Sequence, residues 1–133
     1  MAANTSRLVV AALLAGAAAL PAQADSVACH VTYGGETRVI AAPPVASPYG
    51  VKATAVGSYF MFRIIFRKAP ADLAAIKLYT YADHDEGPAI IHQATWPYPP
   101  PATAGHGFTG LHSVYEPVRD GELQYWCELK DAP

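Results

Sequence analysis

The chain has 133 residues, of which 52% are hydrophobic and 15% are charged, and its formal net charge is −2 at pH 7. This balance excludes an intrinsically disordered chain, because disorder requires low hydrophobicity together with high net charge. It also provides no basic patch that would neutralise the phosphates of nucleic acid. Beyond residue 24 no apolar run reaches the roughly 18 residues of a membrane span. We therefore expect a globular protein that neither binds nucleic acid nor spans a membrane.

Residues 1–24 have the pattern of a secretory signal peptide. Arg7 precedes an apolar run from Leu8 to Leu20, and Ala22-Gln23-Ala24 supplies the small residues that signal peptidase accepts. We expect cleavage after Ala24, which leaves one domain over residues 25–133. The expected location is the periplasm or the outside of the cell.

The chain has two cysteines, Cys29 and Cys127, and they lie near the two ends of the expected domain. In an exported protein paired cysteines are the norm, because the compartment is oxidising. We therefore predict a Cys29–Cys127 disulfide, which would stabilise the fold by at most ~4–5 kcal/mol on chain-entropy grounds. Free thiols or metal ligation are the alternatives.

Alternating apolar and polar runs, separated by Gly, Pro and Asp clusters, predict short β-strands along the expected domain. In chain order these runs cover residues 27–33, 37–41, 51–56, 58–67, 76–82, 89–96 and 111–117, before the last strand of a final hairpin. Seven or eight such strands are typical of an antiparallel β-sandwich of immunoglobulin-like size. A small β-barrel is the alternative.

The first hairpin turns at Gly34-Gly35, since primed turns need the positive φ that glycine adopts easily. A two-residue loop would set Val31 opposite Arg38. A three-residue loop would instead set Val31 opposite Val39. The apolar match favours the three-residue loop, and the register stays open between the two.

The run from 58 to 67 has the clearest alternation in the chain. Its even positions are all apolar, whereas its odd positions are mixed: the even ones are Phe60, Phe62, Ile64 and Phe66. The next strand repeats this pattern, with four residues expected to point inward: Ile76, Leu78, Thr80 and Ala82. A period of two with one apolar face predicts a sheet with one side on the core.

The final hairpin turns at Asp120-Gly121, the signature of a two-residue type I′ turn. That turn sets Val114 opposite Cys127, and Tyr115 opposite Trp126. The alternation along the two strands of this hairpin predicts that six side chains face the core: Val114, Val118, Leu123, Tyr125, Cys127 and Leu129. Both cysteines thus fall on the apolar phase of their strands, which favours a buried disulfide.

Histidines and a methionine suggest a metal site, because imidazole and thioether groups suit copper in an oxidising compartment. The candidate ligands of copper or another divalent metal are His30, His92, His106, His112 and Met61. No pair among them has the spacing that places two ligands on one face of a strand. Histidines that are solvated or hydrogen-bonded within the structure are the alternative.

Aromatic side chains form two candidate binding surfaces. Tyr59, Tyr79 and Tyr81 are expected to project from one sheet face. The loop 96–110 carries further rings and an imidazole: Trp96, Tyr98, Phe108 and His106. Flat rings could stack on sugars or on apolar peptides, although packing against the protein itself is the alternative.

No residue constellation of an active site is found, so we do not expect an enzyme. The sequence favours an exported binding or accessory protein that contacts a small ligand, a glycan or a protein through the loop 96–110 or the aromatic sheet face. No cofactor is expected apart from the possible metal. Periplasmic metal binding, copper above all, is one alternative function, and a structural or assembly role is another.

Overall fold

The computed structural model describes residues 16, 25–103 and 105–130. The expected signal peptide and its cleavage site therefore lie outside the described residues, apart from Gly16. Among the described residues the regular structure consists of β-strands and two short 3₁₀ turns, at Pro48–Gly50 (η1) and Ala71–Leu73 (η2). No helix within these ranges is long and apolar enough to cross a membrane.

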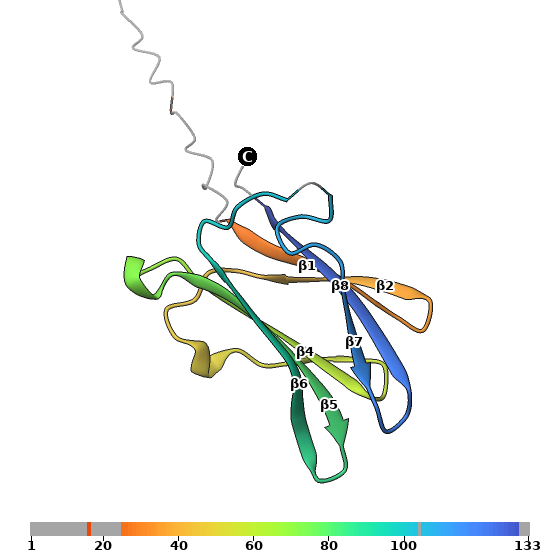
Figure 1. Ribbon diagram of the computed structural model, residues 1–133. Helices are drawn as coiled ribbons and strands as arrows, with labels where there is room; N and C mark the ends of the chain where they lie inside the picture. Colours follow the sequence, from red (N-terminus) through yellow and green to blue (C-terminus); the bar gives the residue numbers. More distant parts are fainter. Residues whose placement is uncertain (1–15, 17–24, 104, 131–133) are drawn as a thin grey trace, which may run out of the picture.

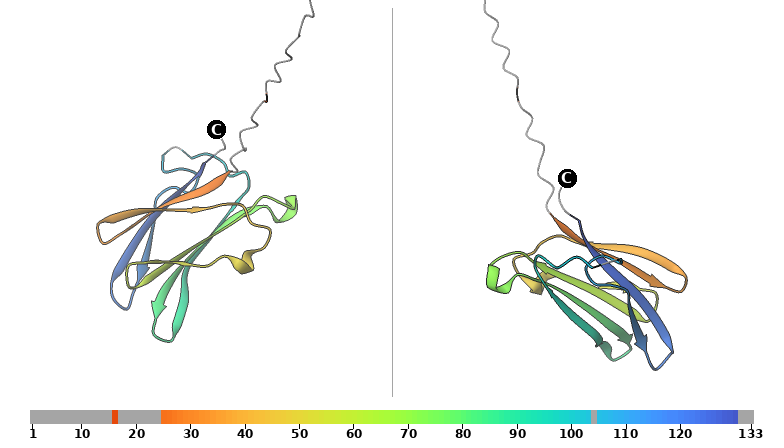
Figure 2. Two further views of the ribbon diagram at one scale, coloured as in Figure 1. Left: turned by 180° about the vertical axis from the view of Figure 1, so that it is seen from behind. Right: turned by 45° about the horizontal axis from the view of Figure 1, so that its top comes forward.

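The strands form two antiparallel sheets that pack face to face (Figures 1 and 2). In chain order they are β1 (Ser26–Tyr33), β2 (Glu36–Ala42), β3 (Thr54–Val56), β4 (Phe60–Arg67), β5 (Ala75–His84), β6 (Gly87–Pro97), β7 (His112–Glu116) and β8 (Gly121–Lys130). The first sheet has the order β2-β1-β8-β7 and the second sheet the order β3-β4-β5-β6. This arrangement confirms the predicted β-sandwich, since two separate sheets are present rather than one closed barrel.

The core lies between the sheets and follows the predicted alternation. The four even positions of β4 are each at most 4% exposed, and on β5 the four predicted inward positions are at most 1% exposed. Tyr125, Leu123 and Val31 face them from the first sheet and are fully buried. Strands β4 and β5 thus place every second side chain in the core, as a period of two requires.

One buried group in this core lacks a partner. Thr80 is fully buried, and its Oγ1 has no hydrogen-bond partner among the described residues. A buried hydroxyl without a partner costs about 1–3 kcal/mol.

We therefore expect Thr80→Val to raise the free energy of unfolding by about 1 kcal/mol in urea denaturation. Thr32→Val is the matched control, because the exposed Thr32 hydroxyl lies 2.7 Å from that of Thr37, and this variant should give no gain. An equal gain in both variants would contradict the prediction.

The predicted disulfide is present and buried. Cys29 lies directly opposite Cys127 in the β1–β8 pairing, the two sulfurs are bonded, and both residues are 0% exposed. The bond therefore joins neighbouring strands of the first sheet, not the two sheets. It links the first strand of the domain to the last.

The favoured register of the first hairpin is wrong. Tyr33 pairs with Glu36 and Val31 with Arg38, so the loop is the two-residue Gly34-Gly35 turn. Both glycines have positive φ, at 63° and 81°, as a type I′ turn requires. The apolar match to Val39 does not set the register, because β2 is an edge strand and Val39 is 59% exposed.

The predicted register of the final hairpin is also wrong. Val114 pairs with Leu123 and Tyr115 with Glu122, so the connection spans residues 117–120. The buried carboxylate of Glu116 explains the longer turn, because it accepts the backbone N–H groups of Val118 at 3.2 Å and Arg119 at 2.9 Å. Val118 consequently lies outside the predicted core face and is 74% exposed.

Candidate functional site

The loop 96–110 folds back onto the sandwich. Phe108 is only 4% exposed and its ring meets the Trp96 ring edge-to-face at 5.7 Å. The Tyr98 ring packs on Phe66 at 5.2 Å, and its hydroxyl donates to Asp25 at 3.0 Å. These three rings close one end of the core, so a ligand could reach them only in part.

The same loop completes the edge of the first sheet beyond β7. Because β7 begins at His112 opposite Tyr125, the next residues of β8 have no strand partner on that side. The backbone N–H of Phe108 donates to the Cys127 carbonyl at 3.0 Å, and the Cys127 N–H donates to the Thr109 hydroxyl at 2.9 Å. The loop therefore satisfies backbone groups that would otherwise be unpaired.

His106 is the exposed member of the predicted loop set, and it joins a cluster on the outer face of the first sheet. The His30 and Trp126 rings stack at 3.9 Å, and His106 meets Trp126 edge-on at 5.8 Å. His30 Nε2 also lies 2.7 Å from a carboxylate oxygen of Glu128. Hydrogen bonds from Lys130 and His30 lower the pKa of Glu128.

The other two predicted histidine ligands lie inside the sandwich, where the edge strands β6 and β7 face each other. The His92 and His112 rings are 5.8 Å apart, and His112 stacks on Tyr125 at 5.1 Å. The Tyr125 hydroxyl lies 2.6 Å from His92 Nε2. Burial raises the pKa of Tyr125, so this hydroxyl keeps its proton and shares a hydrogen bond with the His92 imidazole.

The predicted metal ligands thus fall into separate groups. His92 and His112 lie in the core margin, His30 and His106 lie on the outer face of the first sheet, and Met61 lies on the outer face of the second. In the part of the chain that the structure describes, no group of three or more His, Cys, Asp or Glu side chains could hold a metal ion. Metal binding stays a prediction, without the convergence that it would require.

The half-buried His92 imidazole makes the fold sensitive to acid. Burial lowers the pKa of His92, and the adjacent His112 lowers it further. The folded state therefore binds this proton more weakly than the unfolded state, whose histidine pKa is about 6.5. We expect the free energy of unfolding to be constant above that pH and to fall as the pH drops below it.

The measurement is urea denaturation at pH values from 8 to 5. His92→Phe should flatten the pH dependence, whereas His84→Gln at the β5–β6 turn should retain it. The pH range in which His92 changes the free energy of unfolding is separate from that of Glu128. The pKa of Glu128 is lowered, so its titration changes the stability only in more acidic solution. A His92 variant with the wild-type pH dependence would contradict the prediction.

The outer face of the second sheet contains a group of rings and cations. We call it the tyrosine–cation face and define it by five residues: Arg63, Arg67, Lys77, Tyr79 and Tyr81. The two tyrosine rings are 6.3 Å apart and 26° from parallel, and the Arg63 guanidinium lies 5.7 Å from the centre of the Tyr79 ring. Tyr59 does not join them, because its ring lies under the Arg119 guanidinium at 4.2 Å.

Arg63 holds a short segment of chain across this face. Its Nε donates to the Val51 carbonyl at 2.8 Å and its Nη2 to the Pro48 carbonyl at 2.7 Å. Two hollows flank the held segment. One, of about 210 Å³, includes Met61 and Tyr81 in its lining.

The other hollow, of about 120 Å³, brings two cations and a ring together. Arg67, Lys77 and Tyr79 line it, together with the apolar Ile65 and Leu73. The Nε atom of Arg67 is buried and has no hydrogen-bond partner among the described residues. Buried donors without partners are rare in proteins, and a bound acceptor is one explanation for such an atom. The sequence identified Tyr79 and Tyr81, but Arg67 is distinguished only by its burial.

Comparison with known proteins gives no relative of this chain. No family model, no curated protein and no solved structure matches it. The chemistry of the surfaces described above is therefore the basis for inferring a function.

Proposed function

We propose that this protein is an exported, non-catalytic binding protein that holds an acidic carbohydrate on the tyrosine–cation face. The observation that carries the proposal is the hollow that Arg67, Lys77 and Tyr79 line together, beside an Arg67 Nε that has no hydrogen-bond partner among the described residues. A carboxylate on the ligand would accept hydrogen bonds from the two cations. The sugar ring would then lie against Tyr79.

Charge complementarity supports an anionic ligand. The outward side chains from Met61 to Arg67 on β4 and from Ala75 to Tyr81 on β5 include three cations and no acid. The first outward acid along β5 is Asp83, near the hairpin turn. Cations on a surface attract an anionic ligand and repel cationic ones, which gives selectivity more than affinity.

Polar neighbours on β6 support a carbohydrate over an apolar peptide. Gln93 pairs with Tyr79 and Thr95 with Lys77, so both lie beside the hollow on the same sheet face. The Gln93 amide donates to the Thr95 hydroxyl at 2.7 Å, which leaves further donors and acceptors for sugar hydroxyls. Aromatic rings contribute apolar area for the C–H face of a sugar.

Export is part of the proposal. The Cys29–Cys127 disulfide supports it, because such bonds persist in oxidising compartments. The leader pattern over residues 1–24 supports it independently. Metal binding and an assembly role stay predictions from the sequence, and no contact described above favours either over the tyrosine–cation face.

The test is calorimetric titration of the purified protein with oligogalacturonate, and with a neutral cello-oligosaccharide for comparison. We expect saturable binding of the acidic sugar that weakens with added salt, since exposed charge pairs are screened. Arg67→Gln and Lys77→Gln should each weaken it by about two- to fivefold. Tyr79→Ala should weaken it by roughly tenfold.

Lys130→Gln is the matched control, because this exposed cation lies on the first sheet and its ion pair is with Glu128. Its affinity should equal that of the unmodified protein. Equal binding of both sugars, or an equal loss in the Lys130 variant, would overturn the proposal. Binding of polyglutamate without binding of oligogalacturonate would reassign the face to an acidic peptide and would also overturn it.

A further inference from the structure

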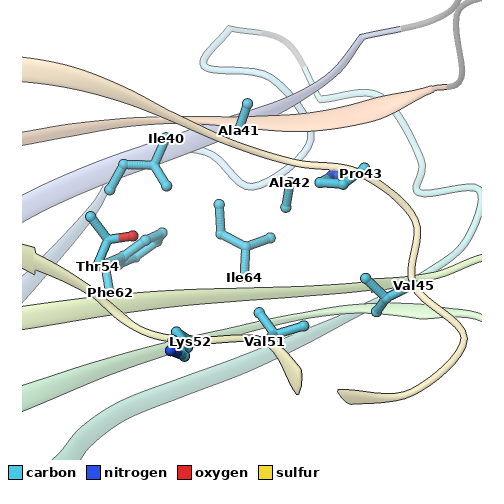
Figure 3. Close-up of a pocket in the computed structure, with 10 residues that line it drawn as sticks. All are labelled: Ile40, Ala41, Ala42, Pro43, Val45, Val51, Lys52, Thr54, Phe62 and Ile64. Atoms are coloured by element: carbon cyan, nitrogen blue, oxygen red, sulfur yellow. The ribbon is translucent and has the colours of Figure 1, made fainter. Parts of the chain in front are cut away.

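The two open margins of the sandwich are filled differently. Between β6 and β7, the margin contains four rings: Trp96, His92, His112 and Tyr125. On the opposite side, near β2 and β3, mostly aliphatic side chains surround a hollow of about 130 Å³ (Figure 3). We call it the β2–β3 hollow.

The local sequence explains why this margin is not filled. The residues that end β2 are small, and Pro43 cannot continue the strand because it has no N–H to donate. The chain then crosses to the second sheet, where the Val45 N–H donates to the Phe66 carbonyl at 2.8 Å. On the other side β3 begins only at Thr54, opposite Phe62, so no strand covers the length of β4 that contains Ile64.

The lining of the hollow is almost wholly apolar. Figure 3 shows Ile40 and Ala42 extending from β2 toward Phe62 and Ile64 of β4. Phe62 and Ile64 are otherwise core residues, at 1% and 4% exposure. An apolar group that entered here would therefore contact the hydrophobic core directly.

The size selects the class of ligand. An engineered cavity of about 150 Å³ lined by Leu, Ile and Phe binds benzene. The β2–β3 hollow, at about 130 Å³, is close to that volume and well below the ~300–1,000 Å³ of sites for larger ligands. It has room for one ring or one branched aliphatic group.

The polar lining residues define the other end of the ligand. They are Thr54 and Lys52. Lys52 is exposed and takes part in none of the ion pairs among the described residues. A carboxylate at the rim would therefore meet a cation that has no other partner.

We propose that the β2–β3 hollow binds a small monocarboxylic acid with a ring or branched apolar end. The apolar end lies between Ile40, Phe62 and Ile64, and the carboxylate pairs with Lys52. This site is separate from the tyrosine–cation face, which lies on the outer side of the second sheet. It does not depend on the function proposed for that face.

The test is a nuclear magnetic resonance titration of the protein with benzoate, with benzyl alcohol as the neutral ring and acetate as the anion without a ring. We expect ring-current shifts at the methyl groups of Ile40 and Ile64 with both ring compounds and none with acetate. Benzoate should bind about two- to fivefold more tightly than benzyl alcohol, the difference that one exposed charge pair gives. Shifts confined to other surfaces would overturn the proposal.

Two variants separate the parts of the site. Lys52→Gln should remove the preference for benzoate without changing the affinity for benzyl alcohol, and Lys77→Gln is the matched control on the other face. Ala42→Leu should fill the hollow and abolish the methyl shifts with both compounds. An unchanged preference in the Lys52 variant would overturn the proposal. Should the Ala42 variant fail to fold, the methyl shifts of the unmodified protein decide between occupation of the hollow and binding elsewhere.

Discussion

Removing the disulfide by the double change Cys29→Ala and Cys127→Ala is expected to lower the free energy of unfolding by about 4 kcal/mol. The bond closes a loop with a sequence separation of 98 residues. Restricting so long a loop in the unfolded chain is worth about 4–5 kcal/mol on chain-entropy grounds. This loss is comparable with the whole stability of a small domain, which is about 5–15 kcal/mol.

The position of the bond in the sheet explains the size of the effect. It joins β1 to β8, the pairing between the first and last strands, whose contacts are the most distant in sequence. Forming that pairing without the bond requires closure of almost the entire domain. Urea denaturation of the double variant, beside the unmodified protein with and without reductant, checks this. The reduced protein should behave like the double variant, and a loss below about 1 kcal/mol would contradict the prediction.

Gly107→Ala is expected to lower the free energy of unfolding by about 3 kcal/mol and to release the loop 96–110 from β8. Gly107 has a φ of 63°, which costs a non-glycine residue about 1–2 kcal/mol. A Cβ atom there would also overlap the Cys127 carbonyl and lie 3.1 Å from the Cα of Glu128. Both neighbours are backbone atoms of a paired strand, so they cannot move aside cheaply.

Gly110→Ala is the matched control for this change. Its φ of 72° gives the same kind of backbone penalty, but a Cβ atom there meets nothing within 4 Å. We expect this variant to lose only about 1 kcal/mol. Urea denaturation measures the difference, and amide hydrogen exchange at Cys127, whose N–H donates to Thr109, reports release of the loop. Equal losses in the two variants would show that close packing on β8 is unimportant.

The strand pattern was readable from the sequence wherever one face of a strand is buried. The even positions of β4 illustrate this, because Phe60, Phe62, Ile64 and Phe66 are all in the core. The inward direction of Cys29 and Cys127 could be predicted for the same reason, since both alternate with outward residues along their strands. Alternation succeeds there because burial excludes every other phase.

The hairpin registers were not readable from the same pattern. The first depends on an edge strand, where an exposed Val39 gives no preference for an apolar partner. The second depends on Glu116, whose carboxylate binds two N–H groups of the turn and overrides the Asp120-Gly121 signal. A buried acid that organises a turn leaves no periodic trace in a sequence.

The candidate sites show the same division. Tyr79 and Tyr81 could be placed on one sheet face from their spacing, and the structure stacks them. Tyr59 has the same phase, but Arg119 of the turn between β7 and β8 covers its ring. Arg67 gains its interest only from the burial of its Nε atom, and the β2–β3 hollow only from the small residues that end β2 and the late start of β3.

The class of the fold, the disulfide and the inward faces of the central strands could be predicted from the sequence, because they follow from local periodicity and from the burial of apolar side chains. How residues from different strands meet became visible only in the folded structure. It divided the predicted histidine ligands between two faces, turned the rings of the loop 96–110 onto the core and left one margin of the sandwich hollow. These arrangements depend on which strands become neighbours, and that choice is made by the packing of the whole chain.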